Sequence, residues 1–275
     1  MRHGHQDRLA DVNKERYDNS GLFNYFFRCV EKFMPWIRNI YLIVSNPEQV
    51  PEAAHQCSKV HVVLHKDFMP AKFLPTFNST TIEMFLPNIQ GLSEHFIYAN
   101  DDMFPIGPLS PEDFFAEDGR IRITLKACSI DHHMADQFRR VCLNNHVHVA
   151  AITGYKFDGH TYLRPSHSFT PMIKSHCQEC LDKLGPSILT TASAFRTSAQ
   201  HNQYIYPLYE CFTRTVAPSP IEFIYTSLKL GGQGIANIIN TGHYRAICIN
   251  DVQIPNRKTF HFDIIKQAFE DILAK

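Results

Sequence analysis

Short apolar runs alternate with helical segments along the first third of this chain. The run IYLIV covers residues 40–44 and ends at a Ser-Asn-Pro turn, and a second run, VHVVLH, follows at 60–65. Before them, apolar residues recur every three or four positions from Leu22 to Phe33, which is the period of an amphipathic helix. A third strand is predicted at HFIYA, residues 95–99. This alternation favours an α/β fold with a Rossmann-like, open and largely parallel sheet flanked by helices.

The second half of the chain divides less clearly. We expect an inserted irregular or helical region at about residues 118–160, with short strands at RIRITL and VHVAAIT. The Gly-Gly-Gln-Gly stretch at 231–234 matches no phosphate-binding pattern and is expected to be a flexible loop. Four further elements are predicted: a helix over 171–184, a helix or strand over 221–230, a strand over 244–249 and an amphipathic helix over 262–273. Because no repeat or linker interrupts the sequence, residues 1–275 are predicted to form a single domain.

Charge and hydropathy narrow the classes of function. Basic and acidic residues number 27 each, so the chain lacks the basic excess of a dedicated nucleic-acid binder. No apolar run approaches the roughly 20 residues of a membrane-spanning helix, and the first residues contain no apolar signal region. The lone pair Cys177 and Cys180 has no second ligand pair at the spacing of a structural zinc site. We therefore expect a cytoplasmic protein without a nucleic-acid partner.

Two of the predicted strands end in the same polar residues. HFIYA leads into Asn100, Asp101 and Asp102, and RAICI leads into Asn250 and Asp251. In an open α/β sheet, ligands bind beyond the carboxyl ends of the strands, so these side chains would meet at one edge. Clustered oxygen ligands suit Mg²⁺ or Mn²⁺ bound together with substrate phosphates. A single aspartate after a strand is more often a turn residue, but the repeated Asn-Asp pair favours a metal site.

The segment Leu74–Ser79 precedes a further predicted helix, which begins with the capping-box pattern Thr80 to Glu83. A polar loop at a helix start can offer backbone N–H groups and side-chain oxygens to a phosphate or a sugar. Asn78 is therefore a candidate for substrate contact. The alternative is that Ser79 or Thr80 only caps the helix and that Glu83 only closes the capping box. Both interpretations stay open on the sequence alone.

Arg164, His167 and Arg196 are the remaining candidates. A histidine titrates near neutral pH and can take a proton from a sugar hydroxyl. An arginine can bind a phosphate through two parallel hydrogen bonds. Taken alone, His167 is more often a structural or surface histidine, and Arg196 is more often part of a surface ion pair. Their interpretation as site residues therefore depends on the order of the motifs around them.

Taken in order, the motifs resemble those of the Stealth family of sugar-1-phosphate transferases. RYDNSGLFNYFFRCVEKFMPWIRNIYLIVS resembles the start of the family's second conserved region, and LPTFNSTTIE with LSEHFIYANDDMFP resembles the rest of it. RPSHSFTPMIKS with the later FRT resembles the third region and ICIND the fourth, so the resemblance extends from Arg16 to Asp251. The family includes bacterial capsular polysaccharide phosphotransferases and the animal GlcNAc-1-phosphotransferase, and RPSHSFTPM is closer to the bacterial branch.

The resemblance implies a reaction and the residues that carry it. A hexose-1-phosphate, such as N-acetylhexosamine-1-phosphate, would pass from a nucleotide sugar such as UDP-GlcNAc to a hydroxyl of an acceptor glycan, with release of UMP. Such a transfer depends on positioning and charge neutralisation, so a metal ion, an arginine and a base are its expected parts. We assign Asp102 and His167 to catalysis, Asp101 and Asp251 to the metal, and Arg28, Asn78, Glu83, Asn100, Arg164, Arg196 and Asn250 to substrate. The pathway would be capsule or exopolysaccharide synthesis, and peripheral association with membrane-bound assembly proteins at the inner face of the membrane is compatible with it.

The sequence departs from the family pattern in two places. Family members usually begin with an apolar strand that leads into a Trp-Val-Asp-Gly-like turn, the first conserved region, and MRHGHQDRLADVNKER contains no such strand. Asn19 stands where an aspartate is usual after Arg16 and Tyr17. Two alternative functions therefore stay open. One is a metal-dependent inverting glycosyltransferase, which would release a nucleoside diphosphate. The other is a truncated homologue that binds glycan or nucleotide without turnover.

Overall fold

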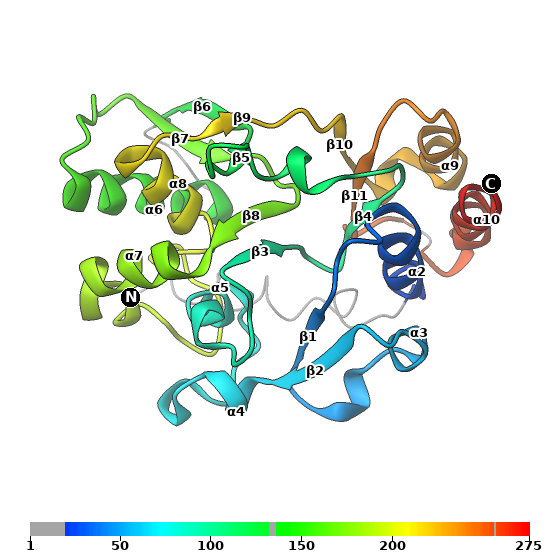
Figure 1. The fold of residues 1–275 in the computed structure, drawn as a ribbon, viewed down its shortest axis with the longest axis horizontal. Helices are drawn as coiled ribbons and strands as arrows, with labels where there is room; N and C mark the ends of the chain where they lie inside the picture. The colour runs from blue at the N-terminus through cyan, green and yellow to red at the C-terminus, as the bar shows by residue number, and fades with distance from the viewer. Residues whose placement is uncertain (1–19, 132–135, 256) are drawn as a thin grey trace.

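The computed structural model describes residues 20–131, 136–255 and 257–275 of the chain. The motif residues Arg16 to Asn19 lie outside these ranges. The described part is an α/β structure in which helices surround several small open sheets (Figure 1). No helix within the described ranges is long and apolar enough to cross a membrane.

A parallel pair of strands forms the first unit. β1 (Ile40–Val44) pairs with β2 (Val60–Leu64) over the full length of both strands. The connection between them contains α3 (Glu52–Gln56), because parallel neighbours need a crossover. α2 (Asn24–Phe33) precedes β1, and the short α4 (His65–Phe68) follows β2. Burial of apolar side chains joins the pair to α2 and α3, through Phe27, Leu42, Val44, Ala54 and Cys57.

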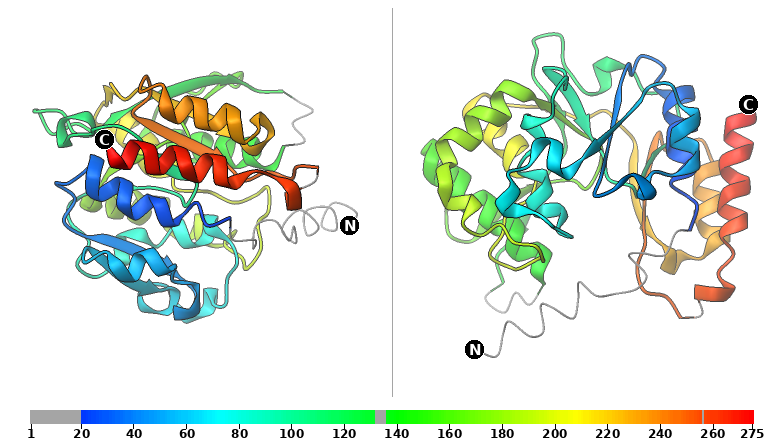
Figure 2. Two further views of the ribbon diagram at one scale, coloured as in Figure 1. Left: turned by 90° about the vertical axis from the view of Figure 1, so that its right-hand side faces the viewer. Right: turned by 90° about the horizontal axis from the view of Figure 1, so that it is seen from below.

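A three-stranded sheet lies next to the C-terminal helices. β10 (Phe223–Ser227) pairs in parallel with β11 (Ala246–Asn250), which pairs antiparallel with β4 (Met103–Pro105). α2, α9 (Gly232–Asn240) and α10 (Phe262–Ala274) lie side by side against it, as the left panel of Figure 2 shows. Their shared core includes Cys29, Phe104, Ile235, Ile247, Ile265 and Phe269.

Within the described ranges, the middle of the chain forms a third unit with three strand pairs and four α-helices. The pairs are β3 (His95–Tyr98) with β8 (Thr170–Ile173), antiparallel; β6 (Leu125–Ser129) with β7 (Thr161–Pro165), antiparallel; and β5 (Arg122–Ile123) with β9 (Ala217–Pro218), parallel. The helices are α5 (Ser79–Glu83), α6 (Gln137–Thr153), α7 (Lys174–Leu189) and α8 (Ile205–Thr213). Their core includes Met84, Phe85, Met172, Cys180, Ile205 and Leu208, so Cys180 behaves as a small apolar side chain.

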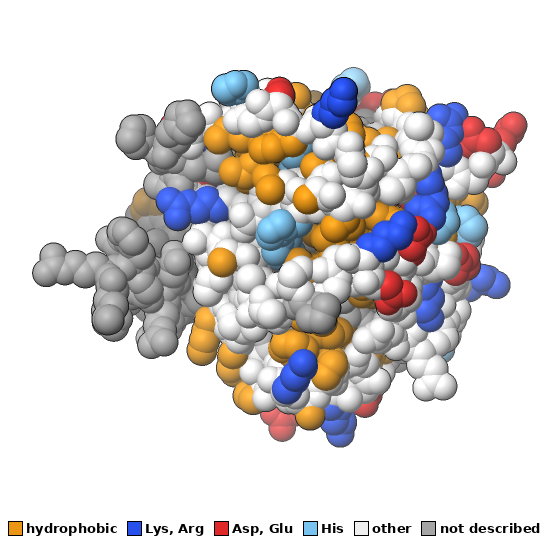
Figure 3. All heavy atoms as spheres, turned by 90° about the vertical axis from the view of Figure 1, so that its left-hand side faces the viewer, with side chains coloured by type: hydrophobic (Ala, Val, Ile, Leu, Met, Phe, Trp, Pro, Cys, Tyr) orange, Lys and Arg blue, Asp and Glu red, His pale blue; other side chains and the backbone are white. Residues whose placement is uncertain are grey.

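Polar and apolar groups are mixed on the outer face of this third unit. Figure 3 shows apolar side chains there in small groups, with Lys and Arg beside Asp and Glu toward one edge. Ion pairs also join α7 to α8. The carboxylate of Glu179 accepts hydrogen bonds from Lys183 and Tyr209, both at 2.7 Å, and from Arg214. These partners hold the pKa of Glu179 at about 2, well below its usual range.

The strand predicted at VHVAAIT is wrong, because these residues form the last turns of α6. Val141, Asn145 and Val149 are buried along one side at helical spacing, and Asp136 caps the helix by accepting from the backbone N–H of Arg139 at 3.1 Å. The β-branched composition of the last turns favours a strand locally, but the buried stripe decides the outcome. The predicted insertion at 118–160 is therefore a regular segment that contains β5, β6 and α6.

Two further predictions need correction. Residues 231–234 are not a flexible loop, because α9 begins at Gly232. A Cβ at Gly232 would lie 2.6 Å from the carbonyl oxygen of His261, so only glycine allows this close approach of the backbones. The helix predicted over 171–184 begins later, since its first residues belong to β8 and α7 starts at Lys174. The ambiguous run at 221–230 contains β10.

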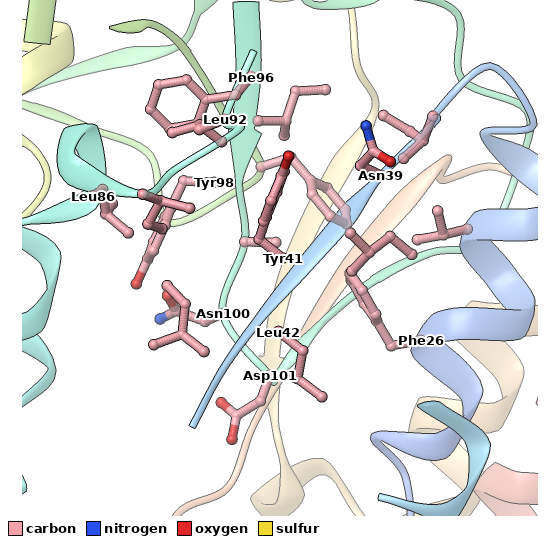
Figure 4. A pocket seen from close by; sticks show the side chains of 18 of the residues that line it. Phe26, Asn39, Tyr41, Leu42, Leu86, Leu92, Phe96, Tyr98, Asn100 and Asp101 are labelled. Carbon is pink, nitrogen blue, oxygen red and sulfur yellow. The ribbon is translucent and has the colours of Figure 1, made fainter. Parts of the chain in front are cut away.

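The largely parallel sheet is not formed as one piece. Among the residues that the structure describes, β1 pairs only with β2, and β3 pairs only with β8. A cavity separates β1 from β3, as Figure 4 shows at close range. All five residues of β1 are apolar, which is typical of a strand buried between neighbours, yet three of them keep partial exposure. The α/β class is confirmed, whereas a continuous Rossmann-like sheet is not.

Candidate active site

Three segments far apart in the sequence bring Asp102, His167 and Cys248 together. Asp102 lies in the turn after β3, His167 in the loop between β7 and β8, and Cys248 within β11. One side-chain oxygen, nitrogen or sulfur atom of each residue lies within 4.8 Å of the other two. The backbone N–H of Ile249 donates to the carbonyl oxygen of Asp102 at 2.8 Å, so β11 fixes the position of this turn.

His167 has a different neighbour on each ring nitrogen. Its Nε2 lies 3.6 Å from Oδ2 of Asp102, and its Nδ1 lies 3.1 Å from the hydroxyl of Tyr204. Tyr204 is 1% exposed, and burial raises its pKa well above the usual range, so its hydroxyl keeps its proton. When Nδ1 carries the hydrogen and donates it to Tyr204, Nε2 is left as the basic nitrogen beside Asp102. In this tautomer Nε2 can accept a proton, and the imidazolium that forms lies next to the carboxylate of Asp102.

The thiol of Cys248 is a hydrogen-bond donor in this cluster. Its Sγ lies 3.2 Å from Oδ2 of Asp102, and the residue is fully buried. Burial and the charge of Asp102 raise the thiol pKa far above its ordinary value. In this state the protonated thiol donates to Oδ2 and orients the carboxylate of Asp102.

Two buried oxygens next to the cluster lack hydrogen-bond partners. They are Oδ1 of Asp102 and Oδ1 of Asn100, and neither meets a donor within the described ranges. Buried polar atoms are nearly always paired, so such an atom in a folded protein points to a water molecule or an ion. Both are hard oxygen ligands of the kind that Mg²⁺ binds. The residues present therefore fit a divalent cation.

The neighbouring aspartates differ in how they could take part. The side chain of Asp101 is exposed and borders the cavity. The protein atoms packed around its carboxyl group nevertheless raise its pKa, and the charges of Asp102 and Asp251 raise it further. This accumulation of negative charge also favours a cation. Asp251 lies close enough to act on Asp101, but both of its oxygens accept hydrogen bonds from Arg257. Asn250 donates through its amide to the hydroxyl of Tyr225.

Glu83 and Arg196 form a second polar group. Glu83 is 6% exposed, and its two oxygens accept from the hydroxyl of Tyr98 at 3.0 Å and from the backbone N–H of Gln203 at 2.9 Å. Burial raises the pKa of Glu83, while the backbone hydrogen bond and the charge of Arg196 oppose this rise. Arg196 donates to the hydroxyl of Ser79 at 2.6 Å and also acts electrostatically on Asp101. The positive charge of Arg196 is thus held among the acidic groups.

Glu83, Arg196, Asn100 and Asp101 line one end of a cavity of about 910 Å³, which is within the size range of small-molecule sites. Asp102, His167 and Cys248 are not part of this lining, and Asp102 of their cluster directly follows Asn100 and Asp101 in the chain. Figure 4 shows Asn100, Asp101 and the hydroxyl of Tyr98 gathered at that end, while apolar side chains, among them Phe96 and Leu92, lie further along. Ser79 also borders the cavity. A ligand there would meet carboxylates, an arginine and an amide at one end and an apolar wall beyond them.

Two residues predicted to bind substrate have other partners. Arg28 lies on α2 and forms a two-point ion pair with Glu270 of α10, at 2.5 and 2.7 Å, because this side of α2 faces α10. Asn78 is fully buried and caps α5 in place of Thr80: its oxygen accepts from the backbone N–H of Thr80 at 3.1 Å. Its amide nitrogen donates to Gln200 at 2.9 Å, so Asn78 has no group left for a ligand. Both assignments are corrected on this geometry.

A third residue predicted to bind substrate, Arg164, does not line the cavity. Arg164 lies on β7 with its guanidinium 5.7 Å from the ring centre of Phe138, outside the cavity lining. The sequence reasoning missed Tyr204 and Cys248. Cys248 stands two residues before the Asn-Asp pair, so the end of that strand could have suggested it. Nothing in the sequence around Tyr204 indicates its contact with His167.

Comparison with known proteins agrees with the motif order. Residues 16–123 match the family model described as Stealth protein CR2, conserved region 2. The exopolysaccharide phosphotransferase cps2G of Lactiplantibacillus plantarum is 33% identical over 270 residues, which is 88% of this chain and 79% of that protein. The receptor polysaccharide phosphotransferase WefC of Streptococcus gordonii is 30% identical over 87% of this chain and 80% of its own length.

A third relative matches a shorter stretch more strongly. A capsular polysaccharide phosphotransferase of Neisseria meningitidis serogroup B is 44% identical over 113 residues, or 40% of this chain and 30% of that protein. The two longer alignments extend well beyond the second conserved region, so they include the segments that carry His167 and Arg196 in this chain. The protein is therefore an enzyme of the transferase class and a member of the Stealth family.

Proposed function

We propose that this enzyme transfers hexose-1-phosphate, and specifically N-acetylhexosamine-1-phosphate, from a nucleotide sugar such as UDP-GlcNAc to a hydroxyl of an acceptor glycan. The setting would be the synthesis of a capsular or exopolysaccharide, as the names of the relatives suggest. The observation that carries the proposal is the pairing of His167 with Asp102, whose second oxygen is buried and unpartnered, as is Oδ1 of Asn100. Cytoplasmic placement at the inner face of the membrane stays a prediction.

The chemical step uses His167 as a base. Nε2 takes the proton of the acceptor hydroxyl, and the resulting imidazolium is stabilised by the nearby carboxylate of Asp102. The acceptor oxygen forms a bond to the phosphorus that carries the sugar. The bond from that phosphorus to the bridging oxygen breaks, and UMP leaves with this oxygen. The product is a glycan phosphodiester, and no oxidation or reduction takes place.

Charge neutralisation is the second requirement of phosphoryl transfer. Arg196 borders the cavity, and its guanidinium can approach the diphosphate of a donor that lies along the apolar wall. Asp102 and Asn100, with Asp101 beside them, would hold Mg²⁺ or Mn²⁺ through their free oxygens. A divalent cation there supplies positive charge to the phosphate oxygens of the donor.

The test is to quantify UMP and UDP after incubation with UDP-GlcNAc and a panel of glycosides, with Mg²⁺ and with chelator. We expect UMP, only with metal, and at least a hundredfold lower rate in Asp102→Asn and in His167→Asn, since each loses a group that acts only in the transition state. Arg28→Ala is a matched control for Arg196→Ala, because Arg28 is paired with Glu270 away from the cavity.

Each other outcome rejects a part of the proposal. UDP in place of UMP would identify an inverting glycosyltransferase. Equal rates in Asp102→Asn and in the unchanged enzyme would exclude the Asp102–His167 site. Binding of the donor without either product would indicate a protein that recognises the nucleotide sugar without turnover.

A further inference from the structure

A second cavity lies beyond the loop that carries His167. Its volume is about 380 Å³, and it lies where β5, β6, the β7–β8 loop and the start of β10 converge, in the upper part of Figure 1. Phe169 borders both this cavity and the larger one, so its ring is part of the wall between them. None of the residues assigned above to the donor lines the second cavity. It is therefore a separate pocket that shares a wall with the candidate active site.

The β7–β8 loop presents different residues to its two sides. Ser166 and Ser168 line the second cavity, whereas His167 between them contacts Asp102 and Tyr204. The backbone N–H of Ser166 donates to the carbonyl oxygen of Thr124 at 2.8 Å, which fixes the loop to the β5–β6 segment. Consecutive Cα atoms are about 3.8 Å apart. A ligand held by the two serines therefore lies against the same loop as the proposed base, on the loop's other side.

The second cavity carries uncompensated positive charge. Arg122 and Lys126 line it, and neither forms an ion pair with a carboxylate in the described part of the chain. Nε of Arg122 is buried and has no hydrogen-bond partner there, and its Nη1 makes only a long contact of 3.5 Å to the carbonyl oxygen of Pro218. The lining carboxylate, Glu222, is already paired with Arg245 at 2.7 Å. An unpartnered buried arginine N–H calls for an anionic acceptor.

The remaining lining groups are those that recognise a sugar ring. Hydroxyl groups come from Thr124, Ser166, Ser168, Thr170 and Ser219. Phe223 and Tyr244 add aromatic rings, whose faces can pack against the C–H face of a pyranose. The cavity is large enough for one sugar unit with a charged substituent, at the lower end of the size range of ligand sites.

We propose that the second cavity binds the acceptor glycan through a sugar that bears a negative charge, a carboxylate or a phosphate. The anion pairs with Arg122 and Lys126, the serines bind the ring hydroxyls, and a neighbouring hydroxyl of the same chain reaches Nε2 of His167. The inference rests on the proposed function for the role of acceptor, but the binding itself does not require it. It makes charge on the acceptor a determinant of specificity.

The test measures binding without donor. Methyl β-glucuronide, glucose 6-phosphate and methyl β-glucoside are titrated into the enzyme by isothermal calorimetry at low salt. We expect at least one of the charged sugars to bind tenfold or more tightly than the neutral glucoside, and the two charged probes distinguish a carboxylate from a phosphate. Raising the salt concentration should weaken this binding, since part of it is ionic.

Variants locate the binding. Arg122→Gln and Lys126→Gln should each weaken the binding of the charged sugar by about tenfold and leave the affinity for the glucoside unchanged. Arg120→Gln is the control, because Arg120 lies two residues from Arg122 but is exposed and paired with Asp118 at 2.7 Å. Lys126 is exposed and unpaired, so its replacement keeps the test valid if Arg122→Gln fails to fold.

Equal affinity for charged and neutral sugars, absence of binding by all three, or retention of binding in both variants would overturn the proposal. The nucleotide product is measured separately. Release of UDP, together with tight binding of a charged sugar that depends on Arg122, would reject the proposed transfer and keep the acceptor site. Release of UMP without tighter binding of a charged sugar would support the proposed transfer and reject the acceptor site.

Discussion

Tyr204→Phe removes one hydroxyl group whose hydrogen bond with His167 sets the orientation of the ring. The hydroxyl lies 3.1 Å from Nδ1, and the tyrosine ring is 1% exposed, so phenylalanine fills the same volume. A hydrogen bond of this kind contributes about 0.5–1.5 kcal/mol. Without it, Nδ1–H loses its acceptor and the imidazole can adopt the other tautomer, which places a hydrogen on Nε2. If the full hydrogen-bond energy is lost from the transition state, kcat falls by about two- to twelvefold, since about 1.4 kcal/mol corresponds to a factor of ten.

The assay is steady-state release of nucleotide from UDP-GlcNAc over a range of donor concentrations. Because Tyr204 does not line the donor cavity, the KM for the donor should change by less than about twofold while kcat falls. Tyr209→Phe is the control, since Tyr209 is equally buried and its hydroxyl donates to Glu179 at 2.7 Å, away from His167. That variant should lose some stability and keep its kcat. An unchanged kcat in Tyr204→Phe, or an equal loss in Tyr209→Phe, would refute the role assigned to His167 and its neighbour.

Three further predictions address charge, pH and packing. Arg196→Ala should raise the KM for the donor or lower kcat by at least tenfold, whereas Arg28→Ala should change both by less than twofold, and nucleotide release measures the difference. Burial and the neighbouring His148 lower the pKa of His201 to about 3. Below about pH 6.5 the unfolded chain therefore binds a proton at this residue that the folded chain does not bind. The free energy of unfolding is thus highest above about pH 6.5 and decreases as the pH falls toward 3. At pH 5 the loss is about 2 kcal/mol, since each pH unit below the unfolded pKa costs about 1.4 kcal/mol, and His201→Gln should flatten this part of the stability curve in urea unfolding. Phe269→Ala leaves a cavity beneath α2 and α9, where the ring is fully buried, and should cost about 3–5 kcal/mol in the same assay.

Local sequence patterns predict a helix or strand correctly when its buried residues recur at the regular spacing of that structure. β1 is a run of five apolar residues, and α10 buries Ile265, Ala268, Phe269 and Ile272 on one side, so both are read correctly from spacing alone. The end of α6 is misread because its β-branched residues favour a strand locally. Its helical form depends on burial against β7, which follows it closely, and against α8, which is remote in the sequence.

The continuous parallel sheet fails for a related reason. Strand sequences indicate that a strand forms, but its neighbours depend on tertiary contacts. β3 pairs with β8, more than seventy residues later, and β1 keeps an edge on the cavity. Neither arrangement is encoded in the composition of the strands themselves.

The strand ends predicted part of the grouping, although not through one sheet. The charges of Asp102 and Asp251 both act on Asp101, while β3 and β11 belong to different sheets, so tertiary packing and not a shared parallel sheet brings the aspartates near one another. Arg28 and Asn78 were assigned from motif position, and their direction is set by α10 and by the buried amide network around Gln200. Tyr204 meets His167 only through the folded chain, so local reasoning had no means of finding it.

The most direct test of the proposed chemistry follows the phosphorus next to the sugar. UDP-GlcNAc labelled with ³²P in the phosphate that bears the sugar is incubated with the enzyme, Mg²⁺ and an acceptor glycan. Transfer of sugar-1-phosphate moves the label to the glycan and leaves unlabelled UMP, and Asp102→Asn abolishes this movement. Label that stays with the nucleotide as UDP, while the sugar alone reaches the glycan, would contradict the account.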